Sequence, residues 1–376
     1  DLVDDDDPDQ RRWTELLDEY AGIEAVIACV EPLAGAAEAS SLVALADRLA
    51  EAFAGDPLVD SVFHRVRADW FRQHALYLLP AESLERFRSF DGILMGAFGD
   101  PRVPDMRHAR DILLGTRFEL DLFANIRPVK CPLEALIPLK GHRAEDIDFV
   151  VFRENTEGAY VGIGGVFKRG TDDEIAIQEE VNTRKGVERI IRLAFDYARR
   201  TGRRRVTMSD KSNAMRFGHE LWQRTFREVA EEYADLESDH YYIDALVMEM
   251  VRAPGKFDVV VTSNLFGDIA TDLGAALQGG MGMAVSGNVH PGRTSMFEPV
   301  HGSAPDIAGR DIANPFGAIL TAAMMLDHTG AGAAASRIER AVTACLQCGD
   351  ATADVGGALG TTAAGAAVLR RLERRR

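Results

Sequence analysis

Short apolar runs rich in valine and isoleucine alternate along this chain with longer stretches of helical periodicity. The runs with the length and β-branched content of buried strands are EAVIACV (24–30), FDGILMGAF (90–98), IDFVVFREN (147–155), RRVTMSD (204–210) and FDVVVTSN (257–264). Residues 182–202 and 219–233 instead repeat apolar side chains every three or four positions, as an amphipathic helix does. Asn182 or Thr183 can cap the first of these helices, and Gly202 can end it. The alternation predicts an α/β protein in which helices pack on sheets.

A chain of 376 residues is longer than one hydrophobic core usually serves, so two domains are expected. The formal net charge of -16 argues against nucleic acid or an anionic membrane as a partner, and an acidic substrate would need a local basic pocket. No apolar run approaches the roughly 18 residues of a membrane span, and no segment resembles a secretory signal. Four cysteines are too few for a disulfide scaffold, so a reducing, cytoplasmic location is expected.

Two carboxylates, Asp268 and Asp272, stand four residues apart in NLFGDIATDLG, directly after an apolar run. One interpretation is a capped, solvated helix start, because the helix dipole favours acidic residues in the first turn. The other is half of a divalent-metal site, because residues i and i+4 share one face of a helix. This stretch alone leaves both interpretations open.

Three arginines could supply the basic pocket that the acidic chain would need. Arg117 and Arg127 lie in LLGTRFELDLFANIRPVK, and Arg153 follows the apolar run IDFVVF. Arginine at strand ends and loops can hold a carboxylate through two parallel hydrogen bonds. Each arginine taken alone is equally compatible with an ordinary surface ion pair.

Further candidates are Tyr160 in RENTEGAY, Lys211 at the end of the TMSD strand, and Asp244 in YYIDALVMEM. An aspartate among such apolar neighbours is costly unless it is paired or bound to a metal, so Asp244 is either a structural carboxylate with a partner or a ligand. The stretch MFEPVHGSAPDIAG (296–309) is a loop by composition, and its backbone amides could hold a phosphate. No G-x-G-x-x-G follows any strand, so a Rossmann dinucleotide site is not indicated.

Together these motifs resemble the β-decarboxylating dehydrogenases, a family that includes isopropylmalate, isocitrate, homoisocitrate and tartrate or malate dehydrogenases. The resemblance runs from about residue 60 to the C-terminus, and it is carried by LDLFANIRPVK, FRENTEGAY, SDKSN, NLFGDIATDL and FEPVHGSAPDIAGRDIANP. It implies a two-domain α/β fold with a non-Rossmann cofactor site. Residues 1–122 and 279–376 would form a large cofactor-binding domain, and residues 123–278 a small domain with the interface of a homodimer.

The resemblance also implies roles for the candidate residues. Arg117, Arg127 and Arg153 would grip the carboxylates of a malate-type substrate. Lys211, reaching in from the partner subunit, would remove the proton of the C2 hydroxyl through a water, and Tyr160 would later protonate carbon. Asp268 and Asp272, with Asp244 from the second chain, would bind Mg²⁺ or Mn²⁺. The implied reaction is a metal-dependent oxidative decarboxylation in which NAD accepts the C2 hydride.

For the cofactor, the resemblance implies contacts from the loop that follows the last strand motif. The residues concerned are Glu298, His301, Gly302, Ser303, Ala304, Asp306 and Asn314. His301 to Ala304 would border the adenosine and pyrophosphate, and Asn314 would meet the adenine. Asp306 stands where NADP-using members carry a basic residue, and its carboxylate would repel a 2′-phosphate, so NAD is expected.

The turn before Arg117 meets the variable substituent of the substrate in this family. Isocitrate enzymes have serine and asparagine where this chain has Asp111 and Leu113, so isocitrate is not expected. Leu113 and Leu114 suit an apolar group such as isopropyl, whereas Arg110 suits a charged one. An apolar 3-alkylmalate such as 3-isopropylmalate is therefore the first choice, and tartrate or D-malate the second.

One segment departs from the family pattern. The family opens with a GDGIGPE loop near the nicotinamide, where this chain has EPLAGAAEAS (31–40) and only Glu38 matches. Side chains in place of glycines crowd a backbone that approaches a ligand. The chain could therefore be a specialised biosynthetic enzyme for a modified malate, or a non-catalytic regulatory relative. The intact lysine, tyrosine, arginines and aspartates favour catalysis.

Overall fold

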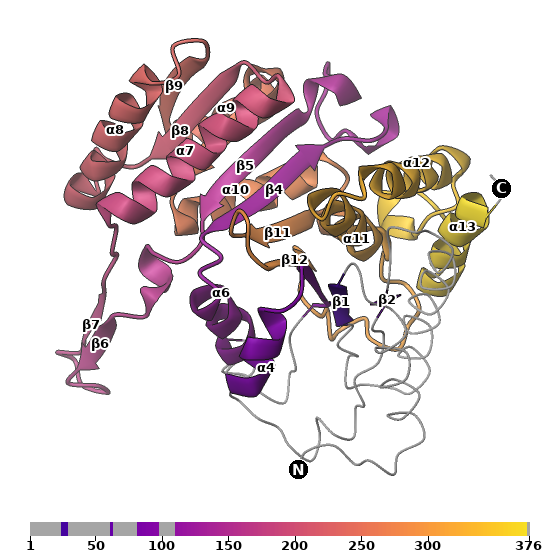
Figure 1. Ribbon diagram of the computed structural model, residues 1–376, viewed down its shortest axis with the longest axis horizontal. Coiled ribbons are helices and arrows are strands. Elements are labelled where there is room, and N and C mark those ends of the chain that lie inside the picture. The colour runs from indigo at the N-terminus through magenta and orange to yellow at the C-terminus, as the bar shows by residue number, and fades with distance from the viewer. Residues whose placement is uncertain (1–23, 29–60, 63–80, 98–109, 374–376) are drawn as a thin grey trace. The chain divides into compact units, whose positions relative to one another are not determined.

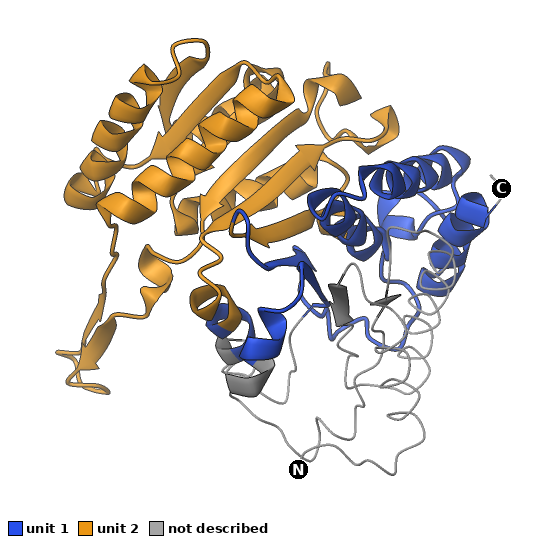
Figure 2. Cartoon of the chain, in the orientation of Figure 1, with its two compact units in different colours: residues 1–115, 291–376 blue, residues 116–290 orange. Residues whose placement is uncertain are grey.

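The computed structural model describes residues 24–28, 61–62, 81–97 and 110–373 (Figure 1). The chain divides into two compact units, residues 1–115 with 291–376 and residues 116–290, which we call unit 1 and unit 2 (Figure 2). The functional domains expected at 1–122 with 279–376 and at 123–278 stay a prediction, as does the dimer interface assigned to the second of them.

Unit 2 is built on a sheet whose strands run in the order β11-β4-β5-β10-β8-β9. The strand bounds are β4 Ala124–Lys130, β5 Asp148–Glu154, β8 Arg205–Asp210, β9 Glu237–Tyr242, β10 Val259–Thr262 and β11 Val285–Val289. Strands β5, β10, β8 and β9 are parallel, whereas β4 is antiparallel to both β5 and β11. The carboxyl ends of the four parallel strands therefore meet at one edge, where β4 begins.

Helices cover both faces of this sheet because successive strand residues point to opposite sides. Val150 and Phe152 pack with the apolar stripes of α7 (Arg184–Thr201) and α8 (Arg216–Glu231). Phe149 and Val151 pack with α9 (Ile243–Arg252) and α10 (Asn264–Leu277) on the other face. In Figure 1, α7 lies in front of β5 and β8, and α10 lies behind them. Parallel strands buried on both faces explain the nearly continuous apolar runs in the sequence.

The ends of α7 follow the capping signals in the sequence. Thr183 has extended backbone angles, and its hydroxyl accepts a hydrogen bond from the Gly186 amide at 3.0 Å. Gly202 ends the helix in the left-handed region, with φ 72°, where glycine has no steric penalty. The expected cap and stop are thus confirmed, as are the strands that were expected within 147–155, 204–210 and 257–264.

Unit 1 contains parallel strands in the order β2-β1-β3-β12, with helix α11 packed on β12 and β3. Its elements are β1 Glu24–Ala28, β2 Ser61–Val62, α4 Ala81–Phe87, β3 Gly92–Met95, a π-helical turn Arg110–Leu114, β12 Ser295–Pro299, α11 Phe316–His328, α12 Gly332–Cys348 and α13 Thr361–Glu373. A short helix, α6 (Gly115–Glu119), lies at the chain boundary between the units. The strands expected near 24–30 and 90–98 are confirmed by β1 and β3.

Two expectations from local sequence are wrong. The stretch 296–309 was expected to be loop throughout, yet its first four residues belong to β12, in which all five residues are buried. Arg153 was expected to follow its strand, yet it is the sixth of the seven residues of β5, and Arg127 is the fourth of the seven residues of β4. In both stretches, pairing with neighbouring strands stabilises a β-strand even though proline and charged residues are unfavourable there.

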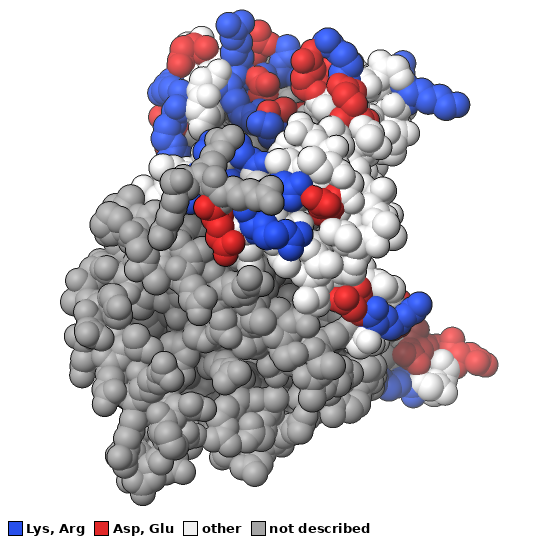
Figure 3. Space-filling model, turned by 90° about the vertical axis from the view of Figure 1, so that its right-hand side faces the viewer, with Lys and Arg blue, Asp and Glu red and all other residues white. Residues whose placement is uncertain are grey.

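A two-stranded antiparallel arm extends from unit 2 (Figure 1, lower left). Its strands are β6 (Gly164–Phe167) and β7 (Ile175–Gln178), and every residue in them is exposed, including Phe167 at 57%. Among the described residues no helix is both long and apolar enough to cross a membrane. On the face seen in Figure 3, the described surface intersperses basic and acidic side chains beside an uncharged area.

The cap of α7 can be tested by substitution. Thr183→Ala removes the acceptor for the Gly186 amide, so we expect it to lower the free energy of unfolding by about 1 kcal/mol. Thr201→Ala on the last turn of the same helix is the matched control. It removes the hydroxyl's bond to the Tyr197 carbonyl and a longer contact with the Ala198 carbonyl, and it should change stability by less than about 0.5 kcal/mol. Equal melting temperatures for the two variants would contradict the capping role.

Candidate functional site

Alternation along two neighbouring strands places two of the candidate arginines on one face of the unit 2 sheet. Arg127 and Val129 share a face of β4, and Arg153 and Val151 share a face of β5. Both valines belong to the core under α10, so both arginines point toward that helix. The helix comes this close because it has a glycine at position 267, where a Cβ would lie 2.6 Å from the Arg153 Cβ and 2.5 Å from its Cγ.

Arg153 is 2% exposed, and residues of α10 satisfy its guanidinium. Its Nη1 forms an ion pair with Asp268 Oδ1, and its Nε and Nη2 donate to Asn264 Oδ1 at 3.0 and 2.8 Å. Asn264 Nδ2 in turn donates to the Glu157 carbonyl at 3.0 Å. The guanidinium is therefore held in one orientation by an acid and an amide that are one helical turn apart.

Arg127 is fixed in a similar way. Its Nε donates to Asn125 Oδ1 at 2.7 Å and its Nη1 to Thr271 Oγ1 at 2.6 Å. Its Nη2 lies 3.4 Å from Asp268 Oδ1. Asn125 is itself anchored by donating to Ser286 Oγ and to an asparagine oxygen of β11, at 2.7 and 2.8 Å. Both buried arginines thus share Asp268 as an anion.

The third arginine, Arg117, lies on α6 and is 6% exposed. Its positive charge acts on both Arg153 and Asp268, so all three arginines belong to one cluster. Burial, followed by the charge of Arg127, lowers the pKa of Arg153 to about 10. A group of cations that crowd one another in this way attracts an acidic ligand.

Tyr160 reaches the same cluster from a short 3₁₀ turn, Ala159–Val161, that follows β5. Its hydroxyl donates to Asp268 Oδ2 at 3.0 Å, and the Arg153 guanidinium lies 5.2 Å from the centre of its ring. Burial and the negative charge of Asp268 raise the pKa of Tyr160, so the phenol keeps its proton and can donate it.

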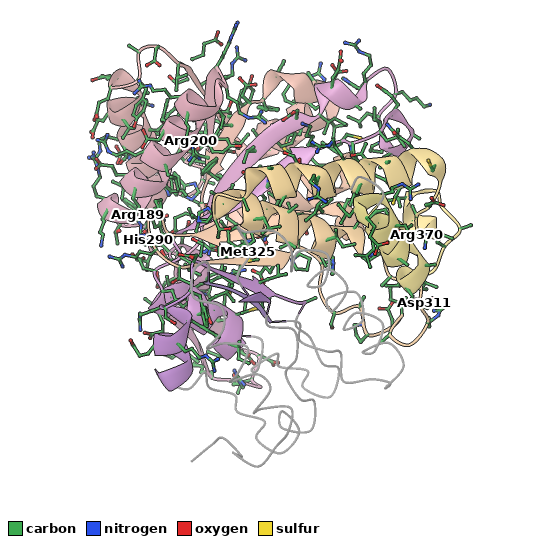
Figure 4. The ribbon with its side chains drawn as sticks, turned by 45° about the vertical axis from the view of Figure 1, so that its right-hand side comes forward. Arg189, Arg200, His290, Asp311, Met325 and Arg370 are labelled. Carbon is green, nitrogen blue, oxygen red and sulfur yellow. The ribbon has the colours of Figure 1, made fainter. Side chains whose placement is uncertain are left out.

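Contacts within unit 2 support the turn that carries Tyr160. The Glu154 carboxylate accepts hydrogen bonds from the Thr156 amide and hydroxyl and from the Glu157 amide. The Arg189 guanidinium donates to both oxygens of Asp121 at 2.9 Å and to the Thr156 hydroxyl at 2.8 Å. His290 approaches the same aspartate at 3.6 Å, and Figure 4 shows Arg189 and His290 next to each other.

The two aspartates of α10 do not mark the start of a helix. The helix begins at Asn264, so Asp268 and Asp272 lie beyond its first turn, and the capped-start interpretation is wrong. Burial raises the pKa of Asp268, but Arg153 and Arg127 outweigh it and hold this pKa below its usual range. Burial and the nearby Asp268 charge raise the pKa of Asp272. A cation between the two carboxylates would relieve this repulsion, so the pair fits a hard divalent ion.

Lys211 and Asp244 form a pair of their own at the carboxyl edge of the sheet. Lys211 directly follows β8, and its Nζ donates to Asp244 Oδ1 at 2.5 Å. The side chain of Asp244 is 68% exposed in the first turn of α9, which corrects the expectation of an aspartate enclosed by apolar neighbours. The hydrogen bond from Lys211 holds the pKa of Asp244 below its usual range. Among the described residues neither side chain bonds to the arginine cluster.

The described residues of one chain contain no group of three or more histidine, cysteine, aspartate or glutamate side chains placed to hold a metal ion. Asp268 and Asp272 are a pair on one helix, whereas Asp244 contacts Lys211. The three aspartates are thus not gathered into one such group among the described residues.

The proposed cofactor residues lie in unit 1, in β12 and the segment between β12 and α11. Glu298 is 7% exposed inside β12, and Asp306 is exposed. Ala304 has φ 45°, a left-handed conformation that is unusual for alanine. His301 Nδ1 lies 3.0 Å from the Gly302 carbonyl oxygen, and the position of a Gly302 Cβ would be open space. Ser303 is half-buried beside them.

Asn314 has hydrogen-bond partners at both ends of its side chain. Its Nδ2 donates to Asp354 Oδ2 at 3.0 Å, and its Oδ1 accepts from the Phe316 amide at 2.9 Å, where α11 begins. Both polar atoms of this side chain therefore have partners within the fold, and the contact of Asn314 with adenine stays a prediction.

The half-buried Leu113 and Leu114 lie in the π-helical turn of unit 1. The side chains of Arg110 and Asp111, and the altered segment 31–40, lie outside the described residues. Asn264, Gly267, Thr271 and Asn125 hold the arginines in place, although no role was expected for them. The signal in the sequence was their position within two motifs, Asn125 in LDLFANIRPVK and the other three in NLFGDIATDLG.

Comparisons with known proteins agree with this geometry. A family model described as isocitrate/isopropylmalate dehydrogenase matches residues 65–368. A 3-isopropylmalate dehydrogenase of Thermobifida fusca is 48% identical over 297 residues, which are 78% of this chain and 83% of that protein. One of Frankia casuarinae is 50% identical over 270 residues, 71% of this chain and 78% of that protein.

A solved structure of isocitrate dehydrogenase from Methylococcus capsulatus superposes with a TM-score of 0.80 at 36% identity, covering 93% of this chain and 99% of that one. The family match covers far more than half of the chain, and the relatives are far above 30% identity. The chain thus belongs to the isocitrate/isopropylmalate dehydrogenase family, a family of oxidoreductases.

Proposed function

We propose that the protein oxidises and decarboxylates a 3-substituted malate with NAD and a divalent metal, and that 3-isopropylmalate is its substrate. The observation that carries this proposal is the cluster of three buried arginines around Asp268, with a protonated tyrosine in contact with the same carboxylate. The printed names of the most similar relatives support the choice of substrate.

The arginines would bind the two carboxylates of the substrate. Arg127 and Arg153 have Asp268 as a partner, and the charge of Arg117 acts on the same carboxylate. Guanidinium groups gathered in this way can bind a dicarboxylate through bidentate hydrogen bonds. The strongly acidic chain then attracts its substrate only at this local site.

A divalent ion held by Asp268, Asp272 and Asp244 would draw electron density from the substrate's C2 oxygen and stabilise the charge that develops there. Lys211, in its neutral amine form, would take the proton of the C2 hydroxyl through a water, and Tyr160 would later give its phenol proton to carbon. The hydroxyl of Tyr160 is a suitable donor because burial and Asp268 favour its protonated form.

NAD bound along the segment from Glu298 to Asn314 would accept the C2 hydride. The exposed Asp306 can accept hydrogen bonds from ribose hydroxyls, and its charge repels the extra phosphate of NADP. Leu113 and Leu114 would meet the apolar substituent at C3.

We further propose a homodimer in which each active site is shared. On α9, Asp244, Met248 and Val251 follow a helical spacing of four and three, and the two apolar residues are 50% and 42% exposed. On α10, Leu265 and Ile269 are 38% and 52% exposed beside Asp268 and Asp272. The outward faces of both helices therefore combine unburied apolar side chains with the metal carboxylates.

A second copy of this chain is the natural cover for such a face, because a two-fold interface pairs a patch with itself. Such an interface would bring Lys211 and Asp244 of one subunit to the Asp268 and Asp272 of the other. The exposed apolar side chains of the arm, such as Phe167 and Ile175, would add buried area.

The reaction is tested by following NADH formation at 340 nm with 3-isopropylmalate, D-malate, tartrate and isocitrate, each with Mn²⁺ and either NAD or NADP. We expect turnover with 3-isopropylmalate and NAD, because the leucines favour an apolar group and Asp306 rejects NADP. Turnover of another malate instead would change the group that we assign to C3 of the substrate. If a folded dimer forms no NADH with any of these substrates, the result would favour a non-catalytic relative altered at residues 31–40.

The metal site is tested without turnover. We expect Mn²⁺ to raise the melting temperature of the wild-type protein, and Asp272→Asn to abolish this rise and reduce kcat about 100-fold or more. Glu220→Gln, which alters an exposed carboxylate on α8, is the matched control. A Mn²⁺-dependent rise in the Asp272→Asn variant equal to that of the control would refute the assignment.

The shared site is tested by complementation between inactive variants. Lys211→Met and Asp272→Asn chains, carrying different tags, are co-expressed and the mixed dimer is isolated. If Lys211 serves the partner's site, one of the two sites keeps every wild-type group, so we expect about half of wild-type activity per dimer. A mixed dimer of Asp268→Asn and Asp272→Asn should be inactive, because each site then lacks a ligand. No activity in the first mixture would show that the lysine serves its own chain.

A further inference from the structure

A fully buried histidine, His219 on α8, lies behind Lys211 and is not part of the reaction proposed above. The Lys211 amide donates to His219 Nδ1 at 2.7 Å, and His219 Nε2 lies 3.1 Å from Glu180 Oε1. The ring of Phe266 on α10 packs edge-on against the imidazole, with centroids 5.2 Å apart. Within the part of the chain that the structure describes, the one ionisable side chain bonded to this histidine is Glu180, whose side chain is 17% exposed.

These contacts define the protonation of the ring. An amide N–H can only donate, so His219 Nδ1 must be the unprotonated nitrogen. The proton therefore lies on Nε2, which donates to the Glu180 carboxylate. A doubly protonated ring would place a second N–H against the Lys211 amide and break this contact. Glu180 thus sets the tautomer that Lys211 requires, as carboxylate partners of functional histidines do.

The contact with His219 completes the anchoring of the Lys211 backbone. The Lys211 carbonyl accepts from the amides of Ala214 and Met215 at 2.9 and 2.8 Å, which closes the turn between β8 and α8. With its N–H held by His219, both main-chain groups of Lys211 have partners, and the direction of its Cα–Cβ bond is fixed. The side chain of Lys211 therefore starts from a fixed point, and its ammonium group lies against Asp244.

Glu180 also belongs to the segment that returns from the exposed arm and that contacts the turn of Tyr160. The Gly158 amide donates to the Val181 carbonyl at 2.7 Å, and Gln178 Nε2 donates to the Ala159 carbonyl at 3.0 Å. One short segment, residues 178–181, therefore touches the supports of both proposed proton-transfer groups, the lysine through His219 and the tyrosine through its own turn.

We propose that His219 is a positioning residue for Lys211, and that Glu180 holds it in the required tautomer. The inference depends on the role proposed for Lys211 as the group that removes the hydroxyl proton. An error of about 1 Å in the position of such a group can slow the reaction about 100-fold without weakening substrate binding. His219 should therefore affect kcat more than KM.

The test compares two amide substitutions that each keep one of the two ring contacts. In His219→Asn the side-chain oxygen takes the place of Nδ1 and can accept from Lys211. In His219→Gln the side-chain NH₂ takes the place of Nε2 and can donate to Glu180. The Lys211 amide N–H then has no acceptor. Each variant is assayed with Mn²⁺, NAD and 3-isopropylmalate, and with substrate deuterated at C2.

We expect kcat to fall about 10- to 100-fold in His219→Gln, with KM within about threefold of wild type and a larger deuterium isotope effect on kcat. His219→Asn should recover kcat to within about threefold. Packing alone predicts the opposite order, because asparagine leaves the larger cavity in a fully buried site. Equal activities, or a more active glutamine variant, would overturn the inference.

If melting temperatures show that either histidine variant is unfolded, the inference is tested with variants of Glu180 instead. Glu180→Gln keeps an acceptor for Nε2–H and should retain kcat, whereas Glu180→Leu should lower it at constant KM. Equal kcat in these two variants would count against the inference. Lys211→Met separates the two proposals, because wild-type turnover in that variant would overturn the role of the lysine. If Lys211→Met is inactive but the His219 variants keep the wild-type kcat, only the role of the histidine would be overturned.

Discussion

The ion pair between Arg153 and Asp268 is the contact on which the rest of the site depends. A guanidinium that is 2% exposed is costly to bury without an anion, and losing one partner of a buried pair typically costs about 3–5 kcal/mol. Asp268 also faces Arg127 and accepts the Tyr160 hydroxyl, so it fixes two cations and a phenol at once. Its partners in turn keep the pKa of this carboxyl low, which leaves it negatively charged.

This arrangement requires α10 to lie unusually close to the sheet. A Cβ at position 267 would collide with Arg153, and a Cβ at position 274 would lie 2.7 Å from Val129 Cγ2. Glycine at both positions, two helical turns apart, lets the helix axis approach β4 and β5 along its length. The carboxylates of the helix are then near enough to bond directly to strand arginines. The price of this approach is the conformational freedom of glycine within a helix, about 1 kcal/mol at each position.

The groups proposed to transfer protons are held by different contacts from the groups proposed to bind the substrate carboxylates and the metal. The arginines and Asp268 are fixed by side chains of α10 and β4, whereas Lys211 is fixed through its main chain by His219. Tyr160 is fixed by a turn that contacts the segment returning from the arm. A base on the carboxyl edge of β8 and an anion site under α10 fit a reaction centre completed by a second subunit.

Local sequence determined the caps of α7, the five strands and the types of residue that carry the chemistry, because propensity, periodicity and capping act over a few neighbouring positions. It could not determine that Arg127 sits in mid-strand, that Asp268 lies beyond the first turn of its helix, or that Asp244 is exposed. The bonds of Arg127 join segments more than 100 residues apart, β4 and α10. Local sequence also could not determine the contacts of Asn264 and His219, which look like ordinary polar residues in the sequence. Only tertiary structure brings their side chains to Arg153 and Lys211, because a hydrogen bond requires its two atoms within about 3 Å and the chain alone does not specify that distance.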